Sequence, residues 1–224
     1  MSPVLSIAVL ISGGGTTLTN LLQRIDAKEL RANVCLVLAS RECTGVEKSQ
    51  RAGLPTRVLP QKEYRDTASY SEAVFRCCRE AGVDYVVLGG FLTRLAIPAD
   101  FINRVINIHP SLIPAFCGEG MFGHHVHEAA LARGVKVSGC TVHFCDGEYD
   151  HGPIILQRTV PVLDDDTADS LQQRVFAAEC EALPAALQLI ATGLFRVEGT
   201  HVRLKSDSRD ITVPAESPVE PAIR

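Results

Sequence analysis

The sequence lacks any cluster of lysine and arginine. Its 22 basic residues are spread among 26 acidic ones, and the net charge is −4. Nucleic-acid-binding proteins usually carry a concentrated basic surface, so we expect no nucleic-acid partner, although one small phosphate can still be bound. With 224 residues, 46% of them hydrophobic and 21% charged, the chain has the composition of a globular protein with one sizeable core.

The sequence also lacks paired cysteines, a signal peptide and a long apolar run. Its eight cysteines include no CxxC pair, which argues against zinc or redox chemistry and favours buried free thiols in a reducing compartment. The first apolar run, residues 4–11, has no basic flank and no cleavage site, and it is too short to span a membrane. We therefore expect a cytoplasmic protein with no membrane partner.

Apolar runs alternate with helical patterns through the first half of the chain. The strand-like runs cover residues 4–11, 33–39, 56–59, 85–88 and 104–108. The helical patterns cover residues 16–25, 45–52 and 67–81. This alternation predicts right-handed crossovers and a parallel sheet. Because ligands bind at the carboxyl ends of such strands, the candidate site segments are 12–17, 89–95 and 107–114.

The second half predicts a different arrangement. Two strand-like stretches, residues 136–145 and 153–162, are joined by a short acidic turn and should pair antiparallel. A helix is expected over residues 127–133, and a long one over residues 168–191 with a kink at Pro184.

The fold class follows from both halves. We predict one α/β domain over residues 1–204, Rossmann-like, with a mostly parallel sheet and an antiparallel C-terminal extension of that sheet. Beyond residue 204 the sequence is polar and contains three prolines, so residues 205–224 are expected to be a flexible tail.

A glycine-rich turn, SGGGTT at residues 12–17, joins the first strand to the first helix. Glycines let the backbone approach a ligand, and the helix N-terminus offers free N–H groups to an anion. The turn has no lysine of a Walker A loop and no third glycine of a dinucleotide fingerprint. It therefore suits a single phosphate group, and the alternative is a tight turn without a ligand.

A second constellation is formed by Asn107, His109 and Asp150. The period of a strand puts Asn107 and His109 on the same side, at the carboxyl end of a buried strand, and Asp150 could reach the same crevice. The three suit acyl transfer to an amine: an amide and an imidazolium stabilise an oxyanion, while an ionised carboxylate raises the pKa of the histidine and helps remove the amine proton. The alternative is a hydrogen-bonded pair with no catalytic role.

Three blocks resemble the phosphoribosylglycinamide formyltransferase family, folate-dependent enzymes of purine biosynthesis. They are NIHPSLIP at residues 107–114, GCTVHF at 139–144 and DHGPIILQ at 150–157. The blocks stand in the family order within a resemblance that runs from residue 4 to residue 200. It implies transfer of the formyl group from 10-formyltetrahydrofolate to the amine of 5'-phosphoribosylglycinamide, giving formylglycinamide ribonucleotide and tetrahydrofolate.

The resemblance also implies roles for single residues. The catalytic residues would be Asn107, His109 and Asp150. The phosphorylated substrate would contact Gly15, Thr16, Thr17 and Glu179, the last through its ribose. The folate would contact Leu92, Thr93, Arg94, Leu95 and Asn107. Thr17 and Thr93 depart from the family pattern, and the loop over residues 115–127 is longer than usual and could act as a lid.

Other histidines and other activities offer alternatives to this assignment. His124, His125 and His127 form no recognisable zinc pattern, so we expect no metal; His143 is either a partner of Asp150 or a satisfied core residue. Formyltetrahydrofolate deformylase, in which water replaces the amine, and a non-catalytic folate- or nucleotide-binding module remain alternatives. We expect no extra regulatory or RNA-binding domain, small-molecule partners only, and a monomer or homodimer.

Overall fold

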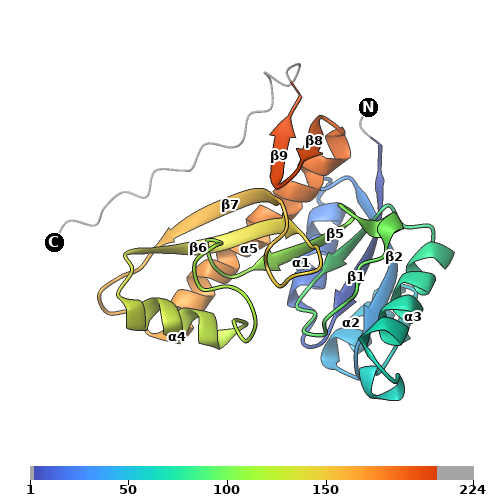
Figure 1. The fold of residues 1–224 in the computed structure, drawn as a ribbon, viewed down its shortest axis with the longest axis horizontal. Helices are drawn as coiled ribbons and strands as arrows, with labels where there is room; N and C mark the ends of the chain where they lie inside the picture. The colour runs from blue at the N-terminus through green and yellow to red at the C-terminus, as the bar shows by residue number, and fades with distance from the viewer. Residues whose placement is uncertain (1–2, 206–224) are drawn as a thin grey trace.

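A computed structural model describes residues 3–205 (Figure 1). Its strands are β1 (Leu5–Ile11), β2 (Ala32–Ala39), β3 (Thr56–Val58), β4 (Tyr85–Leu88), β5 (Val105–His109), β6 (Val137–Phe144), β7 (Ile154–Pro161), β8 (Phe195–Glu198) and β9 (His201–Leu204). Its α-helices are α1 (Thr16–Asp26), α2 (Thr44–Arg51), α3 (Thr67–Glu80), α4 (His124–Arg133) and α5 (Ala168–Thr192). Short 3-10 helices cover Gln61–Glu63 and Ala99–Phe101. The predicted tail, apart from Lys205, lies outside the described residues.

The described strands form one sheet in the order β3-β2-β1-β4-β5-β6-β7-β9-β8. Neighbouring strands from β3 to β5 are parallel, as the alternating pattern predicted. The antiparallel pairing of β6 with β7 is also confirmed, and β6 joins the parallel part by pairing antiparallel with β5. The sheet is thus a mostly parallel one with an antiparallel extension, and the predicted α/β class is correct.

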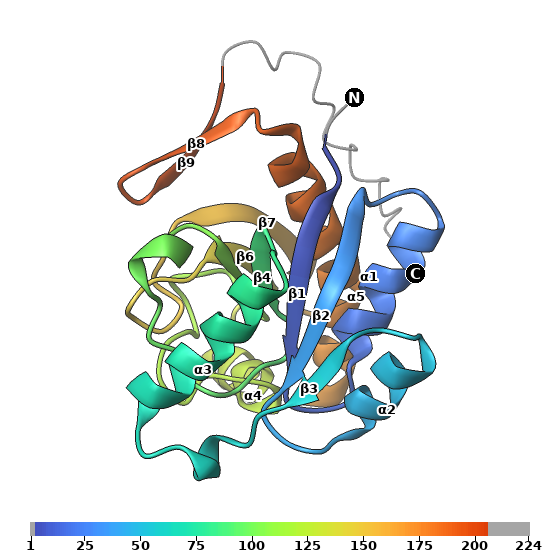
Figure 2. The ribbon, with the colours of Figure 1, turned by 90° about the vertical axis from the view of Figure 1, so that its right-hand side faces the viewer.

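Helices cover both faces of this sheet. Residues of α1, α2, α4 and α5 share one apolar cluster with the strands, whereas α3 packs into a second cluster on the opposite face. Figure 2 shows α3 on one side of the strands and α1, α2 and α5 on the other. The buried strands are therefore apolar on both faces, which explains the continuous apolar runs in the sequence.

Two elements differ from the sequence prediction. The helix α4 begins at His124, three residues earlier than the expected start at residue 127. The hairpin of β8 and β9 was not predicted at all; its two strands have only four residues each and are mostly exposed. The long helix α5 starts at a capping box built on Thr167 and runs across Pro184 to Thr192, close to the predicted bounds.

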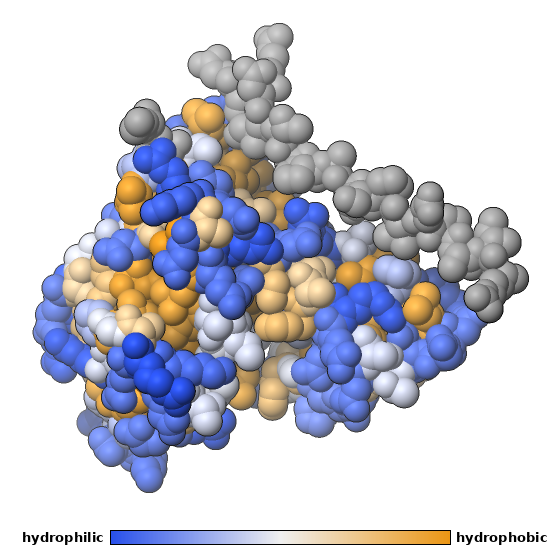
Figure 3. Space-filling model, turned by 180° about the vertical axis from the view of Figure 1, so that it is seen from behind, coloured by the Kyte–Doolittle hydropathy of each residue, from blue (hydrophilic) through white to orange (hydrophobic). Residues whose placement is uncertain are grey.

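The helix α5 is the one described helix that is long and apolar enough to cross a membrane. However, 44% of its most apolar stretch is buried inside the protein, and its apolar side belongs to the cluster under β6 and β7. Elsewhere, hydrophobic residues reach the surface as patches between hydrophilic ones, as the view from behind shows (Figure 3). We therefore interpret α5 as a core helix, whose apolar composition reflects its burial.

Candidate active site

A cavity of about 640 Å³ opens at the carboxyl ends of β4 and β5, beside the start of α1. Its wall is built from the residues after β4, the end of β5, two further loops and one side of α5. This is the edge of the sheet at which an α/β protein is expected to bind its ligand. The loops in question cover residues 118–123 and 145–150.

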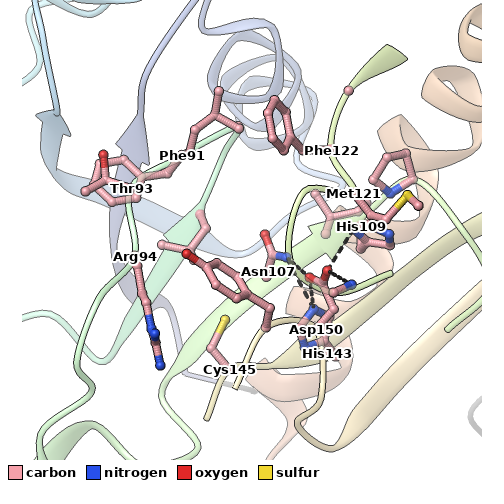
Figure 4. A pocket seen from close by; sticks show the side chains of 18 of the residues that line it. Phe91, Thr93, Arg94, Asn107, His109, Met121, Phe122, His143, Cys145 and Asp150 are labelled. Carbon is pink, nitrogen blue, oxygen red and sulfur yellow. Dashed lines mark hydrogen bonds and ion pairs between the residues drawn. The ribbon is translucent and has the colours of Figure 1, made fainter. Parts of the chain in front are cut away.

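The cavity brings Asn107, His109 and Asp150 together (Figure 4). The Asn107 amide nitrogen donates to Asp150 Oδ1 at 3.3 Å, and His109 Nδ1 lies 3.4 Å from Asp150 Oδ2. His143 joins them, since its Nε2 lies 3.2 Å from the Asn107 amide nitrogen and 3.7 Å from Asp150 Oδ1. The three predicted residues therefore form one cluster, and His143 is the partner of Asp150 that the sequence left open.

Strand geometry explains how these side chains meet. Asn107 and His109 are alternate residues of β5 and thus project from the same face. Asn107 stands directly opposite His143 in the antiparallel pair of β5 and β6. Asp150 comes from the following loop, where its φ of 53° turns the chain into the left-handed region that an aspartate tolerates better than most residues.

Burial dominates the electrostatics of His109. The side chain is only 4% exposed, and this burial lowers the pKa of His109, while the charge of Asp150 and the contact with the Phe116 carbonyl act in the opposite direction. The predicted effect of the Asp150 carboxylate, which raises the pKa of His109, is present. The net pKa is nevertheless lowered, because removing an imidazolium from water costs more than the carboxylate restores.

Asp150 is held in its charged form. Burial alone would raise the pKa of this carboxyl group, but the nearby His143 ring, the charge of His109 and the N–H of Gly118 together lower it below its usual value. Its Oδ2 accepts the Gly118 N–H at 3.0 Å. The group is therefore an ionised carboxylate inside a largely enclosed site, available as an electrostatic partner and proton acceptor.

The long loop that was expected over residues 115–127 ends at residue 123, just before α4 begins, and it closes one side of the cavity. The Phe116 carbonyl oxygen lies 2.9 Å from His109 Nε2, and Met121 and Phe122 line the cavity itself (Figure 4). Gly118 and Phe116 contact the catalytic cluster through backbone groups, which sequence reasoning could not identify because any residue type carries them. The loop belongs to the site, as its position after His109 suggested.

The glycine turn stands at the start of α1. Thr16 and Thr17 line the cavity, whereas Gly15 lies in the turn behind them with a φ of 65°. A Cβ on Gly15 would come 2.9 Å from the Cα of Gly45, so a side chain there is excluded by both conformation and space. The first N–H groups of an α-helix have no carbonyl partner within the helix, so those of α1 are available to an anion.

Glu179 lines the same cavity from α5. Burial raises the pKa of this carboxyl group to about 8. At neutral pH the group is therefore mostly protonated and can donate a hydrogen bond to a ligand hydroxyl as well as accept one. Sequence resemblance had marked Glu179 as a ribose contact, and the structure brings it to the cavity that holds the other candidate residues.

The predicted folate segment forms another part of the wall. Leu92, Thr93, Arg94 and Leu95 all line the cavity, and Leu92 is 59% exposed at its mouth. The Arg94 guanidinium donates to the Gly147 carbonyl at 3.2 Å and lies 5.4 Å from the centre of the Tyr149 ring. Leu92, Leu95 and the Tyr149 ring give this end of the cavity apolar surface, which suits a flat ring system.

The histidines at the start of α4 lie beside acidic side chains. His124 lies between Glu128 and Asp169, with nitrogen–oxygen distances of 3.6 Å to each, and His125 lies 3.2 Å from Glu128. Within residues 3–205, no group of three or more histidine, cysteine or acidic side chains has the arrangement to hold a metal ion. His127 is buried in the cavity wall instead.

Comparison with known proteins shows the family of the chain. A family model described as formyl transferase matches residues 5–187. The trifunctional purine biosynthetic protein adenosine-3 of Gallus gallus is 41% identical over 194 residues, which is 85% of this chain and 19% of that protein. The chloroplastic phosphoribosylglycinamide formyltransferase of Arabidopsis thaliana is 37% identical over 178 residues, 77% of this chain and 61% of that protein. The chain thus spans about a fifth of the trifunctional relatives' length.

Solved structures share the fold. The glycinamide ribonucleotide transformylase 1 of Symbiobacterium toebii aligns with a TM-score of 0.84 and 38% identity, covering 90% of this chain and 94% of that one. A formyltetrahydrofolate deformylase from Pseudomonas syringae aligns with a TM-score of 0.79 and 25% identity, covering 90% of this chain and 66% of that one. Both a transferase and a hydrolase therefore share this architecture.

Proposed function

The chain belongs to the formyl transferase family, and from this premise we propose that it transfers the formyl group of 10-formyltetrahydrofolate to the amine of 5'-phosphoribosylglycinamide. The products are formylglycinamide ribonucleotide and tetrahydrofolate. The observation that carries the proposal is the convergence of Asn107, His109 and Asp150 in one cavity that the glycine turn also borders. Relatives named for this activity support the same assignment.

The residues suit each charge that the reaction develops. The substrate amine attacks the formyl carbon, and the carbonyl electron pair moves to oxygen. A protonated His109 and the amide of Asn107 stabilise that oxyanion as hydrogen-bond donors. The ionised Asp150 accepts the proton that the amine loses, directly or through one water molecule. The bond from the formyl carbon to the folate nitrogen then breaks, and this nitrogen takes up a proton.

One contact must rearrange before the oxyanion forms. The Asn107 amide nitrogen is directed at Asp150 Oδ1 and at His143 Nε2, so both of its hydrogens have partners without substrate. The contacts of 3.3 and 3.2 Å are long for N–H···O and N–H···N bonds, so sharing one hydrogen with the formyl oxygen costs little. His109 contributes its charge only when protonated, and the ionised Asp150 is what opposes the effect of burial there.

The two ends of the cavity suit the two substrates. Thr16, Thr17 and the helix N-terminus suit a phosphate group, and Glu179 suits a ribose hydroxyl. The segment from Leu92 to Leu95 suits the folate, which binds as a co-substrate with no metal. We expect a cytoplasmic enzyme that works as a monomer or homodimer on small molecules alone.

The second candidate is formyltetrahydrofolate hydrolysis, which the deformylase of similar fold favours. The same three side chains could activate water in place of an amine. A spectroscopic assay of tetrahydrofolate release separates the two. Turnover that requires glycinamide ribonucleotide supports the transferase, whereas equal turnover without the amine supports the hydrolase. Folate binding with no turnover under either condition supports a non-catalytic binding module.

A further inference from the structure

Three successive carbonyl groups of the glycine turn are bonded by one neighbouring segment of the chain. This segment is the loop after β2 together with the helix α2. Its bonds are Arg41 Nε to the Ser12 carbonyl at 2.7 Å, Gly45 N–H to the Gly13 carbonyl at 3.1 Å and Lys48 Nζ to the Gly14 carbonyl at 2.8 Å. The two charged donors therefore act on the backbone of the turn, and the glycine between them allows the close approach.

These bonds determine where the N–H groups of the turn point. In a trans peptide unit the C=O and the N–H that follows it point in opposite directions. Donors on the carbonyls of residues 12, 13 and 14 therefore leave the N–H groups of Gly13, Gly14 and Gly15 facing away from α2. None of these three N–H groups has an acceptor within residues 3–205. They form a set of free donors next to the N-terminus of α1.

The cavity itself offers little positive charge at this end. Its lining in the described chain includes a single arginine and no lysine, and that arginine, Arg94, is bonded at the other end to the Gly147 carbonyl. Arg41 and Lys48 lie outside the lining, and neither forms an ion pair with a carboxylate in the part of the chain that the structure describes. Their charge is therefore not neutralised by a neighbouring acid.

We propose that Lys48 and Arg41 are positioning residues for the phosphate group of the acceptor substrate, which they serve through the peptide groups of the glycine turn. Each cation holds a carbonyl in place and polarises the peptide unit, so the N–H on the far side becomes a stronger donor. The cations also add positive potential behind the turn without contacting the phosphate. This inference rests on the proposed function, since it assumes a phosphorylated substrate at the turn.

The first test replaces Lys48, which is exposed, so its variants are expected to fold. Lys48→Met should raise the KM for glycinamide ribonucleotide about tenfold, the size expected for losing one charged hydrogen-bond donor. The kcat and the KM for 10-formyltetrahydrofolate should stay within about twofold, because the cation acts at the phosphate end. Lys48→Arg should restore most of the affinity. Lys136→Met, which removes a surface lysine paired with Asp164, is the matched control.

A dephosphorylated acceptor, glycinamide riboside, separates phosphate positioning from general damage. Wild type and Lys48→Met should use this acceptor with equal kcat/KM. An unchanged KM for the ribonucleotide would overturn the inference. An equal loss of kcat/KM with both acceptors would also overturn it, as would a loss of affinity that Lys48→Arg does not restore. Either result would indicate a structural role for Lys48.

A second measurement does not depend on turnover. Protein labelled with ¹⁵N-glycine is titrated with inorganic phosphate, and the amide signals of Gly13, Gly14 and Gly15 are followed by NMR. Phosphate should shift these signals in wild type and bind about tenfold more weakly to Lys48→Met. Equal binding in both proteins, or no shift in wild type, would refute the positioning role. If the shifts occur but the ribonucleotide is not formylated, the proposed function fails and the phosphate site stands.

Discussion

Replacing Asp150 with asparagine removes one charge from the candidate active site and keeps the shape of the side chain. The carboxylate accepts the Gly118 N–H on one oxygen at 3.0 Å and the Asn107 N–H on the other at 3.3 Å. An amide has only one oxygen, so its NH₂ group must face one of these two donors. The variant therefore loses at least one charge-assisted hydrogen bond, a loss of about 1.5–3 kcal/mol.

The catalytic loss should be larger than the loss of that bond. The amide can neither accept the proton of the substrate amine nor stabilise a protonated His109. Removing a general base lowers rates by about 10²–10⁴-fold, which corresponds to about 3–5 kcal/mol in the activation barrier. We expect a fall in kcat within this range for Asp150→Asn, measured as tetrahydrofolate release at saturating concentrations of both substrates. Circular dichroism should show an unchanged fold.

The pH dependence provides an independent check. The charge of Asp150 acts to raise the pKa of His109 against the effect of burial. Without that charge the pKa falls further, so the residual activity that requires the imidazolium should disappear at a lower pH than in wild type. Asp164→Asn, which changes a surface carboxylate paired with Lys136, is the control and should keep both rate and profile. A kcat within tenfold of wild type for Asp150→Asn would refute the assigned role.

Two further predictions concern folding stability. A Cβ on Gly152 would come 1.9 Å from a carbonyl oxygen of β6. Gly152→Ala should therefore lower the free energy of unfolding, measured by urea titration, by about 1–3 kcal/mol. Gly147→Ala is the control and should match wild type, because a Cβ on Gly147 would have nothing within 4 Å. The pKa of Glu179 is raised from 4.5 to about 8 in the folded protein. As pH rises, this carboxyl group loses its proton in the unfolded chain before it does so in the folded one. The free energy of unfolding of wild type should therefore fall as pH rises through this range. Glu179→Gln should remove this component and gain about 1–3 kcal/mol relative to wild type between pH 5 and pH 9, and parallel pH trends in the two proteins would contradict the argument.

The sequence was sufficient where the signal is local. Apolar runs alternating with helical patterns predicted the parallel strands and their helices, because a strand buried on both faces must be apolar throughout. The glycine turn and the residues of β5 were predicted for the same reason: the carboxyl ends of such strands are where ligands bind. The hairpin of β8 and β9 was not predicted, although its apolar and polar residues alternate, because strands of four residues are too short to give a distinct pattern.

Only the tertiary structure decided which groups meet. The separation of Asp150 from Asn107 along the chain says nothing about their contact, which depends on the register of β5 with β6 and on a left-handed turn at Asp150. The bonds from Lys48 to the glycine turn and from Gly118 to Asp150 involve backbone groups that every residue carries. The net fall in the pKa of His109 likewise depends on burial, which results from packing of the whole chain. Local periodicity can be read along a sequence, whereas such contacts and desolvation exist only once distant segments have been packed together.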